Sequence, residues 1–165
     1  MIEDSDNGDA TTLWNQDGGA PGVAAYDRLV GMHQTTPNVD WGLTETSVGD
    51  QLKLLDELLE THALIDQGAQ RFALRLMEHV TPSQAWGVSG GVPSGVSVAL
   101  KNGWLSFGGG WHLNSTGRIR GDGRWYLIAM LTSFNPSEDY GTTTINAISS
   151  RVWQALAPTT LSGDQ

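Results

Sequence analysis

The spacing of apolar residues divides the chain into a helical first part and a second part built from strands. Between about residues 4 and 90, apolar side chains recur every three or four positions, which is typical of helices with one buried face. After the glycine-rich run at residues 87–95 the apolar period becomes two, which is the period of a strand. The pattern therefore predicts an α+β fold in which a helical region precedes antiparallel strands.

A clear helical pattern lies between residues 47 and 59. Its apolar stripe consists of Val48, Leu52, Leu55 and Leu59. The charged positions, which we expect to face water, are Asp50, Lys53, Glu57 and Glu60. Lys53 and Glu57 have the spacing of a surface ion pair, and Thr46 or Ser47 provides the N-terminal cap. Further helices are expected near residues 8–14, 20–30 and 67–79, and residues 31–43 are expected to form a loop.

Three strands are predicted, over residues 96–101, 111–119 and 124–132. Short glycine-rich turns at residues 107–110 and 121–123 are typical of connections between antiparallel neighbours. A final helix over residues 138–157 is expected to pack on the sheet, and residues 158–165 are expected to form a flexible tail. Residues 1–157 would thus form one domain, with a helical part at about 4–90, a sheet and helix at about 96–157, and fewer strands than most sheets.

The composition disfavours several classes of function. A net charge of -9 argues against nucleic acid or an anionic membrane surface as a partner, because clustered Lys and Arg drive such binding. With no cysteine, the chain offers no thiolate nucleophile, disulfide or cysteine-bound metal. Its four histidines lack ligand spacing, so no metal or other cofactor is expected. No apolar run approaches the roughly 18 residues of a membrane span, and a signal-peptide pattern is absent, which leaves the compartment undecided.

Two short motifs carry the candidate chemistry. The alternating segment at residues 96–105 contains, in order, Lys101, Asn102, Gly103 and Trp104, and it is typical of a strand with a cation at its edge. Near the N-terminus, Ser5-Asp6-Asn7 precedes a glycine and a short helix. Each motif also has a simpler interpretation: an edge lysine that discourages strand pairing, and a turn or helix cap.

In this order and in these settings, the two motifs resemble the second and third motifs of the serine β-lactamase and penicillin-binding-protein superfamily. The chain looks most like the actinobacterial β-lactamase-like serine hydrolases related to class A, over nearly its whole length. The resemblance implies a β-lactamase/transpeptidase-like fold whose C-terminal helix packs on the sheet. It also implies acyl transfer or hydrolysis at an amide or ester bond of a small-molecule or peptide substrate.

The resemblance implies catalytic roles for three residues. In the family, a Ser-x-x-Lys helix supplies the nucleophilic serine and a lysine that helps to deprotonate it. By matching position, Ser5 would shuttle a proton, Asn7 would bind the substrate amide and Lys101 would hold the substrate carboxylate.

Three neighbouring residues would contact the substrate, again by resemblance. The backbone N–H of Trp104 matches the strand donor of the oxyanion hole, and Gly103 would allow the substrate to approach the strand closely. Asn102 stands where the family usually has threonine or serine. An amide would therefore replace a hydroxyl that contacts the substrate carboxylate.

Two expected parts of the site have no counterpart in the sequence. No Ser-x-x-Lys occurs in these 165 residues, and residues 31–43 lack the Glu-x-x-Leu-Asn motif that holds a water-activating glutamate, although Asp40 lies there. In relatives the first two strands and the nucleophile helix precede the Ser-Asp-Asn motif. We therefore expect either a truncated relative or the C-terminal portion of a hydrolase, completed by an N-terminal fragment, a partner chain or a homo-oligomer. Relatives often act in the cell envelope or outside the cell.

Two other classes of function remain open at this point. The chain fits a non-catalytic binding or scaffold domain that keeps the cleft without the covalent step. It also fits a repurposed, non-hydrolytic enzyme that uses the remaining cleft for a small molecule.

Overall fold

The computed structural model describes residues 1–60 and 64–157. The expected tail at residues 158–165 and His62 lie outside the described residues. The helices are α1 (Asn7–Gln16), α2 (Gly19–Val30), α3 (Val48–Leu59), α4 (Gln67–Glu78) and α5 (Glu138–Ala155). The strands are β1 (Ser97–Phe107), β2 (Gly110–Gly121) and β3 (Arg124–Asn135), and short 3-10 turns form η1 (Trp41–Leu43), η2 (Pro82–Gln84) and η3 (Gly87–Ser89).

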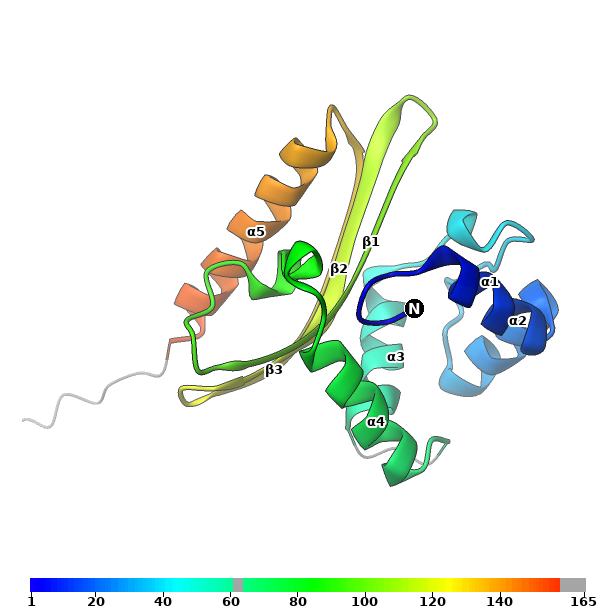
Figure 1. Ribbon diagram of the computed structural model, residues 1–165, viewed down its shortest axis with the longest axis horizontal. Helices are drawn as coiled ribbons and strands as arrows, with labels where there is room; N and C mark the ends of the chain where they lie inside the picture. Colours follow the sequence, from blue (N-terminus) through cyan, green and yellow to red (C-terminus); the bar gives the residue numbers. More distant parts are fainter. Residues whose placement is uncertain (61–63, 158–165) are drawn as a thin grey trace, which may run out of the picture.

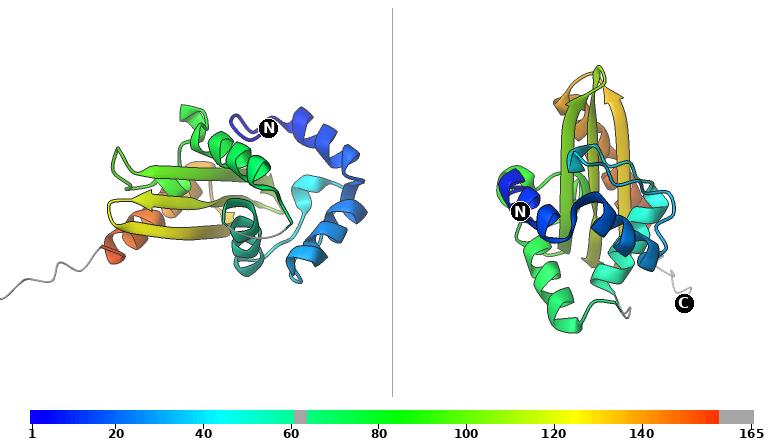
Figure 2. Two further views of the ribbon diagram at one scale, coloured as in Figure 1. Left: turned by 90° about the horizontal axis from the view of Figure 1, so that it is seen from below. Right: turned by 90° about the vertical axis from the view of Figure 1, so that its right-hand side faces the viewer.

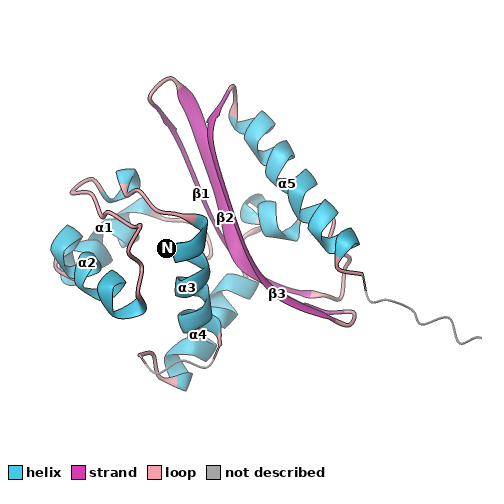
Figure 3. Cartoon of the chain, turned by 180° about the vertical axis from the view of Figure 1, so that it is seen from behind, coloured by secondary structure: helices cyan, strands magenta, loops and turns pink. Residues whose placement is uncertain are grey.

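The three strands form one antiparallel sheet in the order β1-β2-β3. The helix α5 covers one face of this sheet, and α3 and α4 pack against the other, with α1 and α2 beyond them (Figure 1, Figure 3). This arrangement confirms the predicted α+β architecture and its final helix. No helix in the described part of the chain is long and apolar enough to cross a membrane.

Both hairpins turn through two residues with positive φ, Gly108-Gly109 and Asp122-Gly123. Such turns match the twist of the paired strands. The strand β1 was expected to end at Lys101, but it continues to Phe107 because each of its residues pairs with β2. Lys101 therefore lies in the middle of an edge strand, and Gly103 does not interrupt that strand.

The sheet separates two apolar clusters. Between the sheet and α5, the fully buried side chains include Leu100, Leu113, Ile119 and Ile145. The second cluster, on the α3 and α4 side, is made of Leu55, Leu59, Met77 and Ala99. The chain thus has a core on both faces of the sheet, which holds β1 rigidly at its edge.

The glycine-rich segment before β1 is fixed on the α5 side by polar contacts. The Gly87 N–H donates to Asn146 Oδ1 at 2.7 Å, and the Val88 N–H donates to Ser115 Oγ at 2.9 Å. The Ser149 hydroxyl donates to the Val88 carbonyl at 2.7 Å. Gly87 has φ +77°, and a Cβ there would lie 2.1 Å from Ser115 Oγ, so only glycine fits this position.

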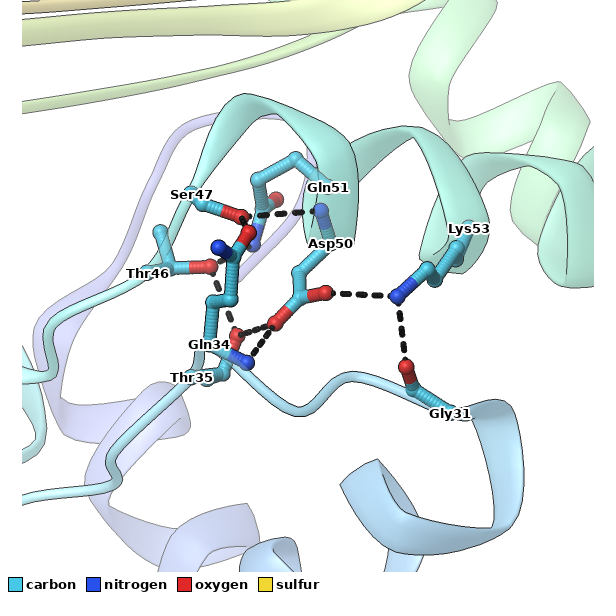
Figure 4. A network of polar contacts seen from close by, with 8 residues as sticks. All are labelled: Gly31, Gln34, Thr35, Thr46, Ser47, Asp50, Gln51 and Lys53. Carbon is cyan, nitrogen blue, oxygen red and sulfur yellow. Dashed lines mark hydrogen bonds and ion pairs between the residues drawn. The ribbon is translucent and has the colours of Figure 1, made fainter.

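A buried carboxylate holds the start of α3 against the preceding loop (Figure 4). Asp50 is fully buried and accepts hydrogen bonds from the Gln34 N–H at 2.6 Å and the Thr35 hydroxyl at 3.0 Å. Lys53 Nζ lies 2.9 Å from its other oxygen. Ser47 caps the helix by accepting from the Asp50 N–H at 3.1 Å.

Two expectations about this helix were therefore wrong. Asp50 and Glu57 are buried and do not face water, and Lys53 pairs with Asp50 and not with Glu57. The Glu57 carboxylate instead accepts from the backbone N–H groups of Leu64 and Ile65, at 2.8 and 3.2 Å. Helical spacing identifies which residues share a face, but it does not show which loops fold back onto that face.

A second buried carboxyl, Asp27 on α2, lies close to Asp50. Asp27 is 5% exposed, and its Oδ2 has no hydrogen-bond partner among the described residues. Burial raises the pKa of the Asp27 carboxyl, and the nearby charge of Asp50 acts in the same direction. The ionised form of Asp27 therefore opposes folding.

We predict that Asp27→Asn raises the melting temperature at pH 7. Because the pKa of Asp27 is raised on folding, stability falls as pH rises from the ordinary value of 3.8 through the folded value. Below that window Asp27 is protonated in both states, so the advantage of asparagine disappears in thermal melts below about pH 4. Asp40→Asn, at an exposed loop carboxylate, is the control. An equal gain at both pH values, or a loss at pH 7, would contradict the prediction.

Candidate active site

The structure brings the two sequence motifs into direct contact. Lys101 Nζ donates to Ser5 Oγ at 2.6 Å, across 96 positions of sequence. The same nitrogen donates to the backbone carbonyl of Asn102 at 2.6 Å. The N-terminal segment therefore crosses beside β1 at the position of the lysine, and Figure 2 shows the N-terminus on this side of the sheet.

Ser5 is held in an unusual backbone conformation. Its φ is +59°, in the left-handed region that non-glycine residues rarely adopt. The Thr81 N–H donates to the Glu3 carbonyl at 2.9 Å, and Gln84 Nε2 donates to the Asp4 carbonyl at 3.4 Å. These contacts tie the residues before Ser5 to the segment around η2 and so hold the backbone that leads into Ser5.

The other two residues of the Ser-Asp-Asn motif lie at the start of α1. Asp6 is the N-cap, and its Oδ1 accepts from the Asp9 N–H at 2.8 Å. Asn7 is the first helical residue, and its side chain is exposed. The helix-cap interpretation is thus correct for Asp6, while Ser5 points to the lysine.

Lys101 is half-buried, and this burial affects how readily its amine is protonated. Burial lowers the pKa of the Lys101 ammonium below its ordinary value, and the nearby Asp4 carboxylate acts in the opposite direction. The result is an amine that loses its proton more easily than a surface lysine.

Asn102 faces the opposite side of β1 from Lys101. It is 4% exposed, and its Nδ2 donates to the backbone carbonyls of Gln84 at 2.7 Å and Trp86 at 3.2 Å. Its Oδ1 has no hydrogen-bond partner among the residues that the structure describes. The amide of Asn102 thus fixes the segment before η3 on β1, and its contact with substrate stays a prediction.

Trp104 lies on the same face as Asn102. Its ring packs edge-to-face on Trp86, with ring centroids 6.0 Å apart at 68°. About a third of its surface remains exposed, 36%. The side chain therefore covers the segment around Trp86, which leaves the backbone of Trp104 as the group available at the strand edge.

The turn at Gly108-Gly109 determines which backbone groups face outward. In a two-residue hairpin the closing pair, here Phe107 and Gly110, is hydrogen-bonded, and successive residues alternate between facing the partner strand and facing away. Trp104 lies three positions before Phe107, so its N–H points to the open edge of β1. A Cβ at Gly103 would meet no atom within 4 Å, so the sheet face at this position, which is the face of Lys101, is open.

One feature near the motif was not predicted from the sequence. A cavity of about 380 Å³ lies between α1 and η1. Its lining includes Trp14, Asp40 and Trp41. The Trp41 ring N–H donates to the Thr11 hydroxyl at 3.1 Å, which joins the loop of residues 31–43 to α1. Nothing in the spacing of these residues indicated that the two tryptophans would line one cavity.

The architecture is that of the β-lactamase and penicillin-binding-protein fold class, with a lysine-bearing edge strand beside a Ser-Asp-Asn helix. The profile of the family described as "Beta-lactamase enzyme family" matches residues 1–156, and the chain belongs to this family. It is 30% identical to the LppW proteins of Mycobacterium tuberculosis and Mycobacterium bovis, over 84% of this chain.

Solved structures show the same fold. PBP-A superposes with a TM-score of 0.80 at 22% identity, covering 94% of this chain. A class A β-lactamase from Mycobacterium abscessus gives a TM-score of 0.80 at 22% identity, covering 93% of this chain. This chain spans 46% of LppW, 58% of PBP-A and 61% of the M. abscessus enzyme. It is therefore short relative to its relatives, as the sequence predicted.

We predict that Asn102→Ala lowers the free energy of unfolding by about 1–3 kcal/mol. The substitution removes both donors, so the half-buried Trp86 carbonyl loses its hydrogen bond and the buried Gln84 carbonyl keeps only the one from the Trp86 N–H. The measurement is denaturant unfolding, with Asn114→Ala on the neighbouring strand as control, because the Asn114 amide makes no hydrogen bond within the described residues. Equal losses in the two variants would show that the Asn102 contacts are unimportant.

Proposed function

We propose that this chain forms the lysine-bearing wall of a β-lactamase-like serine hydrolase site, which acts on an amide or ester substrate with a carboxylate. The observation that carries the proposal is the 2.6 Å contact between Lys101 Nζ and Ser5 Oγ. It joins a cation and a hydroxyl from the two motifs by which the chain resembles that superfamily. Family membership supports the reaction class.

Each residue has a role that its position permits. The Lys101 ammonium attracts the substrate carboxylate, and Ser5 passes a proton between the reacting groups. The exposed amide of Asn7 binds the substrate amide. The outward N–H of Trp104 donates to the carbonyl oxygen, and Gly103 leaves space for the substrate along β1.

The family's nucleophile belongs to a Ser-x-x-Lys motif that these residues do not contain. Relatives and fold neighbours are longer, since this chain spans 46% of LppW and 58% of PBP-A. In the proposal, catalytic turnover therefore requires a further polypeptide segment, in the same protein or in a partner, which supplies that serine. We expect this chain alone to bind substrate without rapid turnover.

A second candidate is a binding domain that has no covalent step. The absence of Ser-x-x-Lys favours it, because a cleft with Lys101 and an outward N–H binds carboxylates and carbonyls without a nucleophile. The two candidates differ in whether an added N-terminal segment restores hydrolysis.

We predict that Lys101→Met weakens binding of benzylpenicillin by about 10- to 100-fold, the effect of losing a charged hydrogen bond. A mutant of PBP-A forms an acyl-enzyme complex with penicillin-G, which makes this ligand a suitable probe. Binding is measured by NMR titration at neutral pH, with Arg71→Met on the exposed surface of α4 as the control. No binding by the unmodified chain at millimolar ligand, or equal weakening in both variants, counts against the proposal.

A further inference from the structure

We propose that Ser5 and Lys101 form a serine–lysine pair in which Ser5 is itself a nucleophile toward activated acyl groups. This inference rests on the proposed acyl chemistry of the cleft, but it assigns Ser5 a different role, that of accepting the acyl group. The chain would then form a covalent adduct on its own, with slow release.

The contact geometry distinguishes Ser5 from the other serines. A nucleophilic hydroxyl needs a base within hydrogen-bonding distance, and Lys101 Nζ lies 2.6 Å from Ser5 Oγ. Ser97, near the start of the same strand, donates to the Glu78 carboxylate at 2.6 Å and lies on the helix α4 side. Within residues 1–60 and 64–157, Ser5 is the serine whose hydroxyl meets an amine.

The backbone conformation of Ser5 supports the same role. Its φ of +59° places the residue in a strained conformation, and such strain persists where the surrounding structure fixes it. The contacts of Glu3 and Asp4 with the segment from Thr81 to Gln84 supply that fixation. The hydroxyl is therefore preorganised toward the amine before any substrate binds.

The surroundings of the amine make the loss of its proton easier, as a general base requires. Lys101 is half-buried, and burial lowers its pKa, while Asp4 is the carboxylate that opposes this shift. Its other contact is the carbonyl of Asn102, which accepts an N–H of the amine in either protonation state. Neutral Lys101 keeps one lone pair for the Ser5 proton.

The surroundings of the pair fit an acyl substrate. The carbonyl of Asn102 and the N–H of Trp104 both face the open edge of β1, so the donor for an oxyanion lies on the strand that carries the base. Gly103 between them leaves the Lys101 face of the strand open, since a Cβ there would meet no atom within 4 Å. The expected substrates are acyl compounds with a good leaving group, such as an aryl ester or a β-lactam.

The step is a balanced acyl transfer. The Ser5 Oγ–H proton moves to the neutral Lys101 amine as Oγ bonds to the carbonyl carbon, and the carbonyl oxygen becomes an oxyanion. The intermediate then collapses, the bond from carbon to the leaving group breaks, and the leaving group takes the proton from the Lys101 ammonium. The products are an ester at Ser5, a protonated leaving group and the neutral amine.

The test is covalent labelling of the unmodified 165-residue chain with a fluorophosphonate probe, followed by peptide mass spectrometry. We expect the probe on Ser5, with loss of fluoride. Ser5→Ala abolishes labelling, and Lys101→Met and Lys101→Arg slow it by about 100-fold or more, the effect of losing a general base. Arginine keeps the charge but cannot take the proton, so it tests the base even if the methionine variant fails to fold.

Asp4→Asn tests whether Lys101 acts as a base or only supports the structure. Removing the carboxylate lowers the pKa of Lys101 further, so the pH profile of labelling shifts to lower pH and the rate at neutral pH rises. Asp139→Asn removes a carboxylate at the start of α5 and leaves the profile unchanged. No labelling of Ser5, or labelling that is indifferent to Lys101→Arg, would overturn this inference. If benzylpenicillin still binds in a Lys101-dependent way, the proposed function stands without it.

Discussion

The hydrogen bond between Lys101 Nζ and Ser5 Oγ is the interaction on which the candidate site depends. It connects the edge of the sheet with the segment that leads into α1, although the two residues are 96 positions apart in the sequence. A half-buried lysine needs acceptors, and it finds two oxygens at 2.6 Å, one from Ser5 and one from Asn102. The same contacts that satisfy the lysine therefore define the position of the serine.

The rest of the fold keeps β1 in place so that this contact can form. Apolar clusters lie on both faces of the sheet, and the Asn102 amide fastens the preceding segment to β1 from the side opposite Lys101. Successive side chains of β1 point to opposite faces of the sheet, so the four residues of the motif fall into two pairs with different contacts. Lys101 and Gly103 lie on the face of the strand that meets Ser5, while Asn102 and Trp104 secure the strand through Gln84 and Trp86.

The sequence predicted the class of fold, every long helix and the two hairpins, because these follow from apolar period and from glycine turns. It missed the burial of Asp50 and Glu57, since a carboxylate between apolar positions has the same pattern whether it meets water or the N–H groups of a returning loop. It also placed Ser5 and Lys101 in one site only through resemblance to a family. No local pattern encodes a contact over 96 positions.

The protonation state of the Ser5–Lys101 pair links the geometry of the site to its departures from the family pattern. Ser5 is the hydroxyl that Lys101 contacts, and in the proposed site the protonation state of this pair decides between binding and reaction. When Lys101 is charged, it attracts carboxylates and Ser5 accepts its hydrogen bond. When Lys101 has lost that proton, a loss that burial makes easier, the direction of the bond reverses and Ser5 becomes the donor. Asp4 opposes the loss of the proton, so in the proposed chemistry it shifts the site toward binding and away from reaction.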